Sequence, residues 1–160
     1  MPFYILAVLL MIAADQAVKY WAFTALQPQG TLPIFANAFH LTYVENRGAA
    51  FSLFAQFDSR WIFVILAVVI TVVIFFALYK GKVHTRTGRC ALLLIAAGAL
   101  GNAADRVVHG FVVDLFDFRL IHFPVFNVAD IFICVGGLLF ILYVLFQCND
   151  DKKKPGTHDE

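Results

Sequence analysis

The sequence predicts an all-α membrane protein with four transmembrane helices and a small β segment between the first two. Hydrophobic residues make up 61% of the chain and charged residues 14%, whereas soluble domains contain about 45–50% apolar and about 25% charged residues. Four apolar segments are long enough to cross a bilayer, which takes roughly 20 residues. They cover residues 3–23, 61–79, 90–108 and 126–146.

The charges between these segments predict that both termini are cytoplasmic (N-in and C-in). The connector 80–89 contains Lys80, Lys82, Arg86 and Arg89 and no acid, and a run of lysines follows the fourth segment. The other two connectors mix acids and bases. Because cytoplasmic loops are enriched in Lys and Arg, we expect the connector 80–89 to lie inside and the other two to lie outside.

The outer connector between the first two helices is predicted to contain short strands over about residues 29–56. The stretches "TLPIF" and "FHLTYVEN" are rich in β-branched and aromatic residues, and "AAFSLF" follows Gly48; such residues favour strands. A small sheet here would place aromatic side chains at the level of the lipid headgroups. Residues 149–160 are polar and are expected to be disordered, so residues 1–148 form a single domain.

The polar residues within the apolar segments fall at one depth, near the outer ends of the helices. They are Asp15, Lys19, Asn102, Asp105, Arg106, Asn127 and Asp130, with Asp114 in the short link between the third and fourth segments. At ~1.5 Å per residue, the carboxylate of the fourth segment lies only about 6 Å below the start of that helix. Polar residues with unrelated roles would be expected at different depths, so their common depth indicates a shared site.

Each of these residues has a structural interpretation beside the functional one. Asp15 and Lys19 are four residues apart with the acid first, which favours an ion pair along one helix. The acid and base that end the third segment could cap that helix or reach the interface. Asn127 could be the N-cap of the fourth helix, with Asp130 as its partner in a variant of the capping box.

The number of carboxylates nevertheless favours a functional site. Ionisable residues at membrane depth are candidates for function, and two carboxyls held close together share a proton because both do not ionise easily. Such a pair can activate water with its charged member and protonate a carbonyl with its neutral member. The sequence contains no G-x-S-x-G or H-E-x-x-H motif and no metal-ligand spacing. We therefore expect no metal or other cofactor and, since there is no basic face, no nucleic-acid partner.

Five motifs in order resemble the lipoprotein signal peptidase family, also called signal peptidase II. They are "DQAVK" at 15–19, "NRGAAFS" at 46–52, "GALGNAADR" at 98–106, "VVD" at 112–114 and "FNVAD" at 126–130. The resemblance implies a bacterial aspartic endopeptidase of the inner membrane, with a β-cradle and an active site at the periplasmic face. Its substrate would be a prolipoprotein with a diacylglyceryl group on the lipobox cysteine, cut just before that cysteine. Membrane lipid would surround the chain, and we expect a monomer.

The resemblance also implies roles for individual residues. Asp114 and Asp130 would form the catalytic dyad. A helix N-terminus favours the ionised form of Asp130, which points to Asp130 as the base and Asp114 as the proton carrier. Coupled carboxyls titrate as a pair, so the reverse assignment stays open, as does Asp117 in place of Asp114. The residues expected to line or support the site are Asn46, Gly48, Asn102, Asp105, Arg106, Asn127, Asp15 and Lys19.

Two other classes of function also fit membrane carboxylates. A proton-coupled carrier could use the same acids, but carriers often have inverted repeats or helices broken at mid-bilayer, and the sequence has neither feature. A structural or assembly protein could use the acid–base pairs to hold helices together. That function would leave Asp114 and Asp130 without a cationic partner nearby in the sequence.

Overall fold

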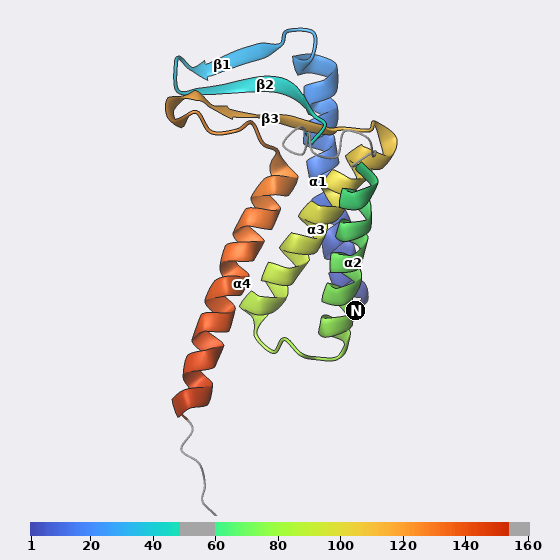
Figure 1. Ribbon diagram of the computed structural model, residues 1–160, viewed down its shortest axis with the longest axis vertical. Helices are drawn as coiled ribbons and strands as arrows, with labels where there is room; N and C mark the ends of the chain where they lie inside the picture. The colour runs from blue at the N-terminus through green and yellow to red at the C-terminus, as the bar shows by residue number, and fades with distance from the viewer. Residues whose placement is uncertain (49–59, 154–160) are drawn as a thin grey trace, which may run out of the picture.

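A three-stranded sheet lies across one end of a bundle of four helices in the computed structural model of the chain (Figure 1). The structure describes residues 1–48 and 60–153, with side chains up to Phe146 in the last helix. The helices are α1 (Pro2–Trp21) with its π-helical continuation η1 (Ala22–Leu26), α2 (Arg60–Tyr79), α3 (Arg86–Val108) and α4 (Val128–Lys153). The strands are β1 (Thr31–Phe35), β2 (Phe39–Asn46) and β3 (Val112–Phe118), and a 3₁₀ turn, η3 (Arg119–Ile121), follows β3.

The four predicted spans are confirmed as four helices that are long and apolar enough to cross a membrane. These are Pro2–Leu26, Arg60–Tyr79, Arg86–Val108 and Val128–Phe146. Local sequence sets where two of them begin. Pro2 stands in the first turn of α1, where its missing N–H costs nothing. Thr85 is the N-cap of α3, and its hydroxyl accepts a hydrogen bond from the N–H of Gly88 at 3.0 Å.

Helix α3 is the most buried of the four and packs against the others through small residues. Its apolar residues join one core cluster with α1 and α2: Val8, Ile74, Leu78, Leu92, Leu93, Ala96 and Ala97. A Cβ at Gly98 would collide with the carbonyl of Ala129 and the side chain of Ile133. Because glycine has no Cβ, α3 and α4 approach closely enough for polar side chains at their outer ends to meet.

The sheet is built from both outer connectors, which corrects the prediction that it lies only between the first two helices. Strands β1 and β2 appear where "TLPIF" and "FHLTYVEN" predicted them, whereas the stretch "AAFSLF" falls outside the described residues. The link between α3 and α4 contributes β3, which pairs antiparallel with β2. Two acids interrupt the apolar residues of β3, so its sequence alone did not indicate a strand; pairing with β2 supplies its hydrogen bonds.

A second core cluster fixes the sheet to the bundle. Ala22 and Leu26 of η1 pack against Val113 and Leu115 of β3. Successive side chains of a strand point to opposite faces, so Asp114, between Val113 and Leu115, points away from this cluster. The strand thereby directs one carboxyl group toward the start of α4.

The ends of the chain lie away from the sheet. The N-terminus, the α2–α3 connector and the last turns of α4 all lie at the opposite end of the bundle (Figure 1). Helix α4 continues to Lys153, beyond the predicted end of the fourth span. The predicted disordered tail falls partly on residues 154–160, outside the described residues, and it stays a prediction together with the single domain over 1–148.

Candidate active site

The ammonium group of Lys19 is the centre of a buried polar network where α1 meets α3. Its Nζ lies 2.9 Å from Asp15 Oδ2 and 3.0 Å from Asp105 Oδ2, and it donates a hydrogen bond to Asn102 Oδ1 at 2.9 Å. An ammonium carries three N–H donors, so each donor has an acceptor. The Lys19 side chain is only 3% exposed, and a charge at this depth is tolerated only when it is paired in this way.

The two carboxylates bound to Lys19 also hold the elements on either side. Asp15 Oδ1 accepts the backbone N–H of Ala129, in the first turn of α4, at 2.8 Å. Asp105 Oδ2 accepts the backbone N–H of Val113, in β3, at 3.1 Å. Asp15 and Lys19 therefore form the ion pair that their spacing predicts. Through Asp15 and Asp105, the two carboxylates on Lys19, the network holds α4 and β3, the elements that carry the predicted dyad.

Asn127 and Asp130 form a reciprocal capping box at the start of α4. The backbone N–H of Asp130 donates to Asn127 Oδ1 at 3.0 Å, and the backbone N–H of Asn127 donates to Asp130 Oδ2 at 3.1 Å. Each side chain satisfies a backbone N–H that the helix itself leaves free. Capping uses one oxygen of each side chain, so their remaining polar atoms face the network.

Two asparagines connect the carboxyl groups of Asp114 and Asp130. Asn102 Nδ2 donates to Asp130 Oδ1 at 2.8 Å. Asn127 Nδ2 donates to Asn102 Oδ1 at 3.1 Å and to Asp114 Oδ1 at 2.6 Å. Side chains from α3, α4 and β3 thus bring the two predicted dyad members into one hydrogen-bonded chain, linked by neutral amides.

Asn46 and Gly48 hold the second oxygen of Asp114. Asn46 Nδ2 donates to Asp114 Oδ2 at 3.0 Å, and Asn46 Oδ1 accepts the backbone N–H of Gly48 at 2.9 Å. Gly48 has a φ of 74°, a left-handed conformation that glycine adopts without strain. This turn at the end of β2 orients the amide so that its NH₂ group faces the carboxyl.

Burial changes the acidity of Asp114, which is 2% exposed. Burial raises its pKa, the hydrogen bonds from Asn46 and Asn127 lower it, and the charge of Asp130 raises it, with a net change from 3.8 to about 6. The folded chain therefore binds this proton more tightly than the unfolded chain. Ionisation of Asp114 costs folding free energy as the pH rises from about 4 to about 6, so near neutral pH this carboxyl carries a proton more readily than an ordinary aspartate does.

Asp117 lies on the other face of β3 and has different partners. It lies three positions after Asp114, an odd spacing, so the two side chains point to opposite sides of the strand. Thr42 Oγ1 donates to Asp117 Oδ2 at 2.8 Å, and Arg119 Nε lies 2.9 Å from the same oxygen. Partial burial raises the pKa of Asp117, but these two donors and the charge of Arg119 lower it overall. The geometry favours Asp114 over Asp117 as a dyad member.

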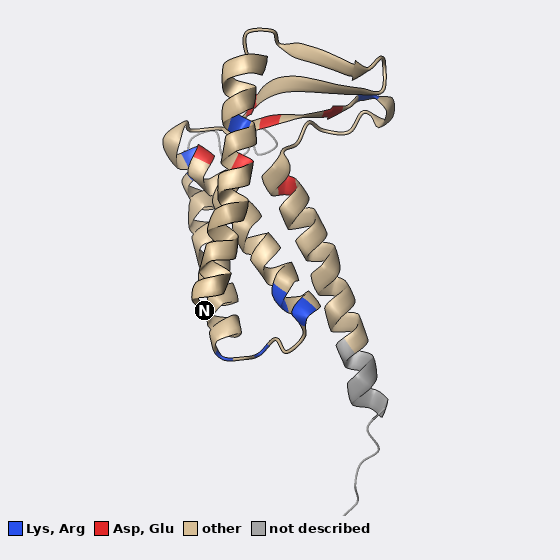
Figure 2. Cartoon of the chain, turned by 180° about the vertical axis from the view of Figure 1, so that it is seen from behind, with Lys and Arg blue, Asp and Glu red and all other residues tan. Residues whose placement is uncertain are grey.

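Arg106 flanks the network at the end of α3. Its Nη1 donates to the backbone carbonyl of Asn102 at 3.1 Å, and its guanidinium lies 4.7 Å from the centre of the Phe63 ring. The negative charges of Asp130 and Asp114 attract the guanidinium of Arg106. Figure 2 shows that the acidic residues of the helices gather at the end of the bundle next to the sheet.

Gln16 also belongs to the network, although it is not among the site residues predicted from the sequence. Its Nε2 donates to Asp105 Oδ1 at 2.9 Å, and to Asp15 Oδ2 and the carbonyl of Gly101 at 3.2 Å each. A neutral amide one residue after Asp15, at the same membrane depth, is the signal that could have identified it. All predicted site residues except Gly48 and Arg106 are linked to one another by side-chain contacts, and these two contact the network through its backbone or an amide oxygen.

The chain is similar to known proteins along most of its length. A model of the family described as signal peptidase (SPase) II matches residues 7–146. The lipoprotein signal peptidase of Clostridioides difficile (strain 630) is 51% identical over 143 residues, which are 89% of this chain and 95% of that protein. The lipoprotein signal peptidase of Clostridium acetobutylicum is 39% identical over 152 residues, 93% of this chain and 96% of that protein.

A solved structure has the same fold. It is described as a bacterial membrane enzyme structure obtained by the in meso method at 2.3 Å resolution, and it superposes with a TM-score of 0.82. The two sequences are 28% identical, and the alignment covers 98% of this chain and 96% of that chain.

Replacing Lys19 with methionine should destabilise the fold strongly. Lys19→Met leaves two buried carboxylates without a counter-charge, and breaking a buried ion pair on one side costs on the order of 3–5 kcal/mol. The measurement is thermal or denaturant unfolding of the purified protein in detergent. Lys82→Met, in the exposed connector, is the matched control and should change stability by no more than about 0.5 kcal/mol. An unchanged unfolding midpoint in Lys19→Met would rule out this role for Lys19.

Proposed function

Because the chain belongs to the signal peptidase II family, we propose that Asp114 and Asp130 are the catalytic dyad of an aspartic endopeptidase. The chain is a peptidase that removes signal peptides from prolipoproteins. We propose further that its substrate carries a diacylglyceryl group on the lipobox cysteine and that the cut falls just before this cysteine. A proton-coupled carrier is not favoured, because the relatives over nearly the whole chain are lipoprotein signal peptidases.

The observation that best supports the dyad is the pair of asparagines that links the two carboxyl groups. Asp130 lies in the first turn of α4, where the helix dipole favours a carboxylate. The raised pKa of Asp114, about 6, favours a carboxyl that holds a proton. A charged carboxylate and a protonated carboxyl in one network are the two groups that hydrolysis of a peptide bond requires.

Hydrolysis then proceeds in two steps. Asp130 removes a proton from a water molecule, the water oxygen attacks the scissile carbonyl carbon, and Asp114 protonates the carbonyl oxygen. The tetrahedral intermediate collapses when the C–N bond breaks. Asp130 gives its proton to the leaving nitrogen of the cysteine, and a hydroxyl of the intermediate returns a proton to Asp114. Both carboxyl groups end the cycle as they began it, and one water is consumed.

An apolar pocket beside Asp130 suits the lipid part of this substrate. It has a volume of about 460 Å³ and lies along the first turns of α4. Its apolar lining residues are Phe123, Phe126, Ile131, Cys134 and Val135. An acyl chain on the cysteine could lie in this pocket while the peptide next to that cysteine reaches the dyad.

The four apolar helices and the family indicate a multi-pass bacterial membrane protein. We propose that it lies in the inner membrane with both termini in the cytoplasm and with the sheet and the dyad at the periplasmic face. Support comes from the α2–α3 connector and the start of α3, which lie away from the sheet and carry four basic residues with no acid, whereas acids accompany the basic residues near the sheet (Figure 2). Positive charge of this kind marks cytoplasmic loops.

Neutralising either dyad carboxyl should abolish cleavage. Asp114→Asn and Asp130→Asn keep the size of the side chain but remove the proton carrier and the base, so each should lower turnover of a purified, lipidated prolipoprotein by about 1,000-fold or more. The measurement is the mobility shift of the substrate on a gel, with the unfolding midpoint as a check of the fold.

Asp117→Asn is the matched control for these variants, since it removes a carboxyl from the same strand on the opposite face. It should keep most of the activity. Turnover retained by Asp114→Asn or Asp130→Asn would eliminate the proposed dyad, and an inactive Asp117→Asn would assign the catalytic carboxyl of β3 to Asp117.

The orientation is tested with a reporter fused after Glu160. A pair of reporters, one active only in the cytoplasm and one only in the periplasm, should place this end of the chain in the cytoplasm. The same pair inserted between β1 and β2, after Asn37, should report the periplasm. A periplasmic signal from the C-terminal fusion would overturn the topology.

A further inference from the structure

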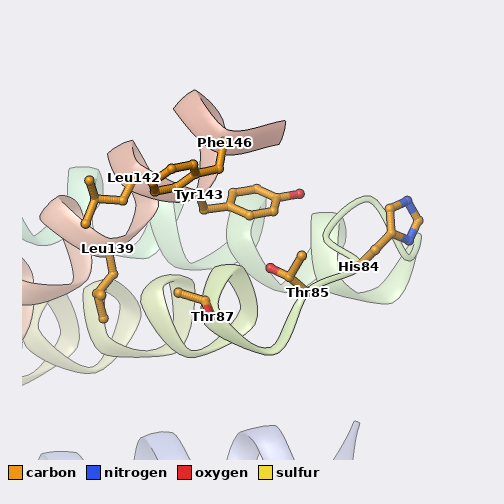
Figure 3. A pocket seen from close by; sticks show the side chains of 7 residues that line it. All are labelled: His84, Thr85, Thr87, Leu139, Leu142, Tyr143 and Phe146. Atoms are coloured by element: carbon orange, nitrogen blue, oxygen red, sulfur yellow. The ribbon is translucent and has the colours of Figure 1, made fainter. Parts of the chain in front are cut away.

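A crevice lies at the end of the bundle opposite the sheet, between the start of α3 and the later turns of α4 (Figure 3). It has a volume of about 410 Å³. One side is polar, since the α2–α3 connector and the first turn of α3 form it, and the other side is an apolar wall of α4. The lining residues are His84, Thr85, Thr87, Leu139, Leu142, Tyr143 and Phe146.

The hydroxyl group of Tyr143 points into this crevice without a partner. The side chain is 9% exposed, and its ring packs on α3 so closely that a Cβ at Gly88 would lie 3.0 Å from Tyr143 Cδ2. Its ring contacts Phe140, and within the described part of the chain its hydroxyl forms no hydrogen bond. Figure 3 shows the hydroxyl directed toward the side formed by Thr85 and His84. The ring is buried while the hydroxyl opens into the crevice, so the hydroxyl is placed to donate a hydrogen bond to a polar ligand there.

The polar side of the crevice is the N-terminus of a long helix. Thr85 caps α3 by accepting from the N–H of Gly88, while Thr87 lines the crevice. The first N–H groups of a helix have no partner within the helix, and together with the helix dipole they favour an anion. Thr87 on this side and Tyr143 on the facing wall of α4 each add a hydroxyl donor to the lining of the crevice.

Positive charge surrounds this end of the bundle. Lys80, Lys82, Arg86 and Arg89 all lie in the connector or the first turn of α3, and among residues with described side chains no acid accompanies them there (Figure 2). Arg89 holds the connector in place, because its guanidinium donates to the Tyr4 hydroxyl at 3.0 Å and to backbone carbonyls of the connector. These four residues do not line the crevice, but their charges lie around it and favour an anion there.

The apolar wall shows which kind of anion fits. Leu142 and Phe146 are 39% and 67% exposed on a helix that is apolar enough to lie in the membrane. A small soluble anion would gain nothing from these side chains, whereas an acyl chain would bury them. Basic pockets between transmembrane helices bind anionic lipid headgroups.

We propose that this crevice binds one anionic phospholipid, with its phosphate at the start of α3 against the hydroxyls of Thr87 and Tyr143. One acyl chain lies along Leu139, Leu142 and Phe146. The site is at the far end of the bundle from Asp114 and Asp130, so it is independent of the proposed catalytic dyad. The lipid joins the N-terminal turn of α3 to α4 at the end where the sheet makes no contact.

The test is a binding titration of the purified protein in neutral detergent, followed by native mass spectrometry. The probes are dioctanoyl phosphatidylglycerol and dioctanoyl phosphatidylcholine, which share their chains and differ in headgroup charge. The wild type should bind phosphatidylglycerol more tightly than phosphatidylcholine. Tyr143→Phe and Thr87→Val each remove a hydroxyl donor to a charged group, so each should weaken binding of phosphatidylglycerol by about tenfold.

Tyr79→Phe is the matched control. It removes an exposed hydroxyl at the end of α2, outside the crevice, and should leave both affinities unchanged. Prolipoprotein cleavage in micelles without added lipid should be the same in all these variants, which shows that they are folded.

Three results would overturn the proposal. One is equal affinity of the wild type for the two lipids. Another is full affinity for phosphatidylglycerol in both Tyr143→Phe and Thr87→Val, which would mean that surface charge alone attracts the lipid. The third is tight binding of glycerol 3-phosphate, because an anion without acyl chains should not be retained.

Discussion

A lysine ammonium buried in an apolar helix bundle is the constraint on which the rest of this structure depends. Lys19 has three N–H donors, and its acceptors come from its own helix and from α3. A buried charge that loses one partner is strongly destabilising, so α1 and α3 meet in a single register. Asp15 extends the constraint to α4 by accepting the N–H of Ala129, and it does so next to Gly101, where a Cβ would lie 2.7 Å from its carboxyl oxygen.

The same network divides its acids into two kinds. Asp15 and Asp105 contact the ammonium directly, which holds them as structural anions that tie α1 to α4 and α3 to β3. Asp114 and Asp130 receive hydrogen bonds from asparagines and a backbone N–H. A neutral amide orients a carboxyl without fixing its charge, whereas a directly paired cation would favour the ionised form of both. Asp114 and Asp130 are therefore oriented and can each take up and release a proton, as the proposed hydrolysis requires.

Local patterns in the sequence predicted the parts of this arrangement that depend on neighbouring residues. Apolar run length identified the four helices, the spacing of Asp15 and Lys19 indicated their ion pair, and the order of Asn127 and Asp130 indicated the capping box. Strand β3 was not predicted because its partner, β2, lies about 70 residues earlier and no local pattern in the sequence indicates that pairing. The choice between Asp114 and Asp117 depends on the same strand, since only its alternation separates the two side chains. Gln16 was not predicted because a neutral amide within an apolar helix indicates a functional site less strongly than the ionisable residues it contacts.

The most direct measurement is the pH titration of the Asp114 carboxyl carbon by ¹³C nuclear magnetic resonance, in the wild type and in Asp130→Asn. Burial and the charge of Asp130 both raise the pKa of Asp114, to about 6. The carboxyl should therefore titrate near pH 6 in the wild type and at a lower pH once Asp130 is neutral. A wild-type pKa near the ordinary value of 3.8, or the same pKa in both proteins, would contradict a coupled dyad in which Asp114 holds the proton.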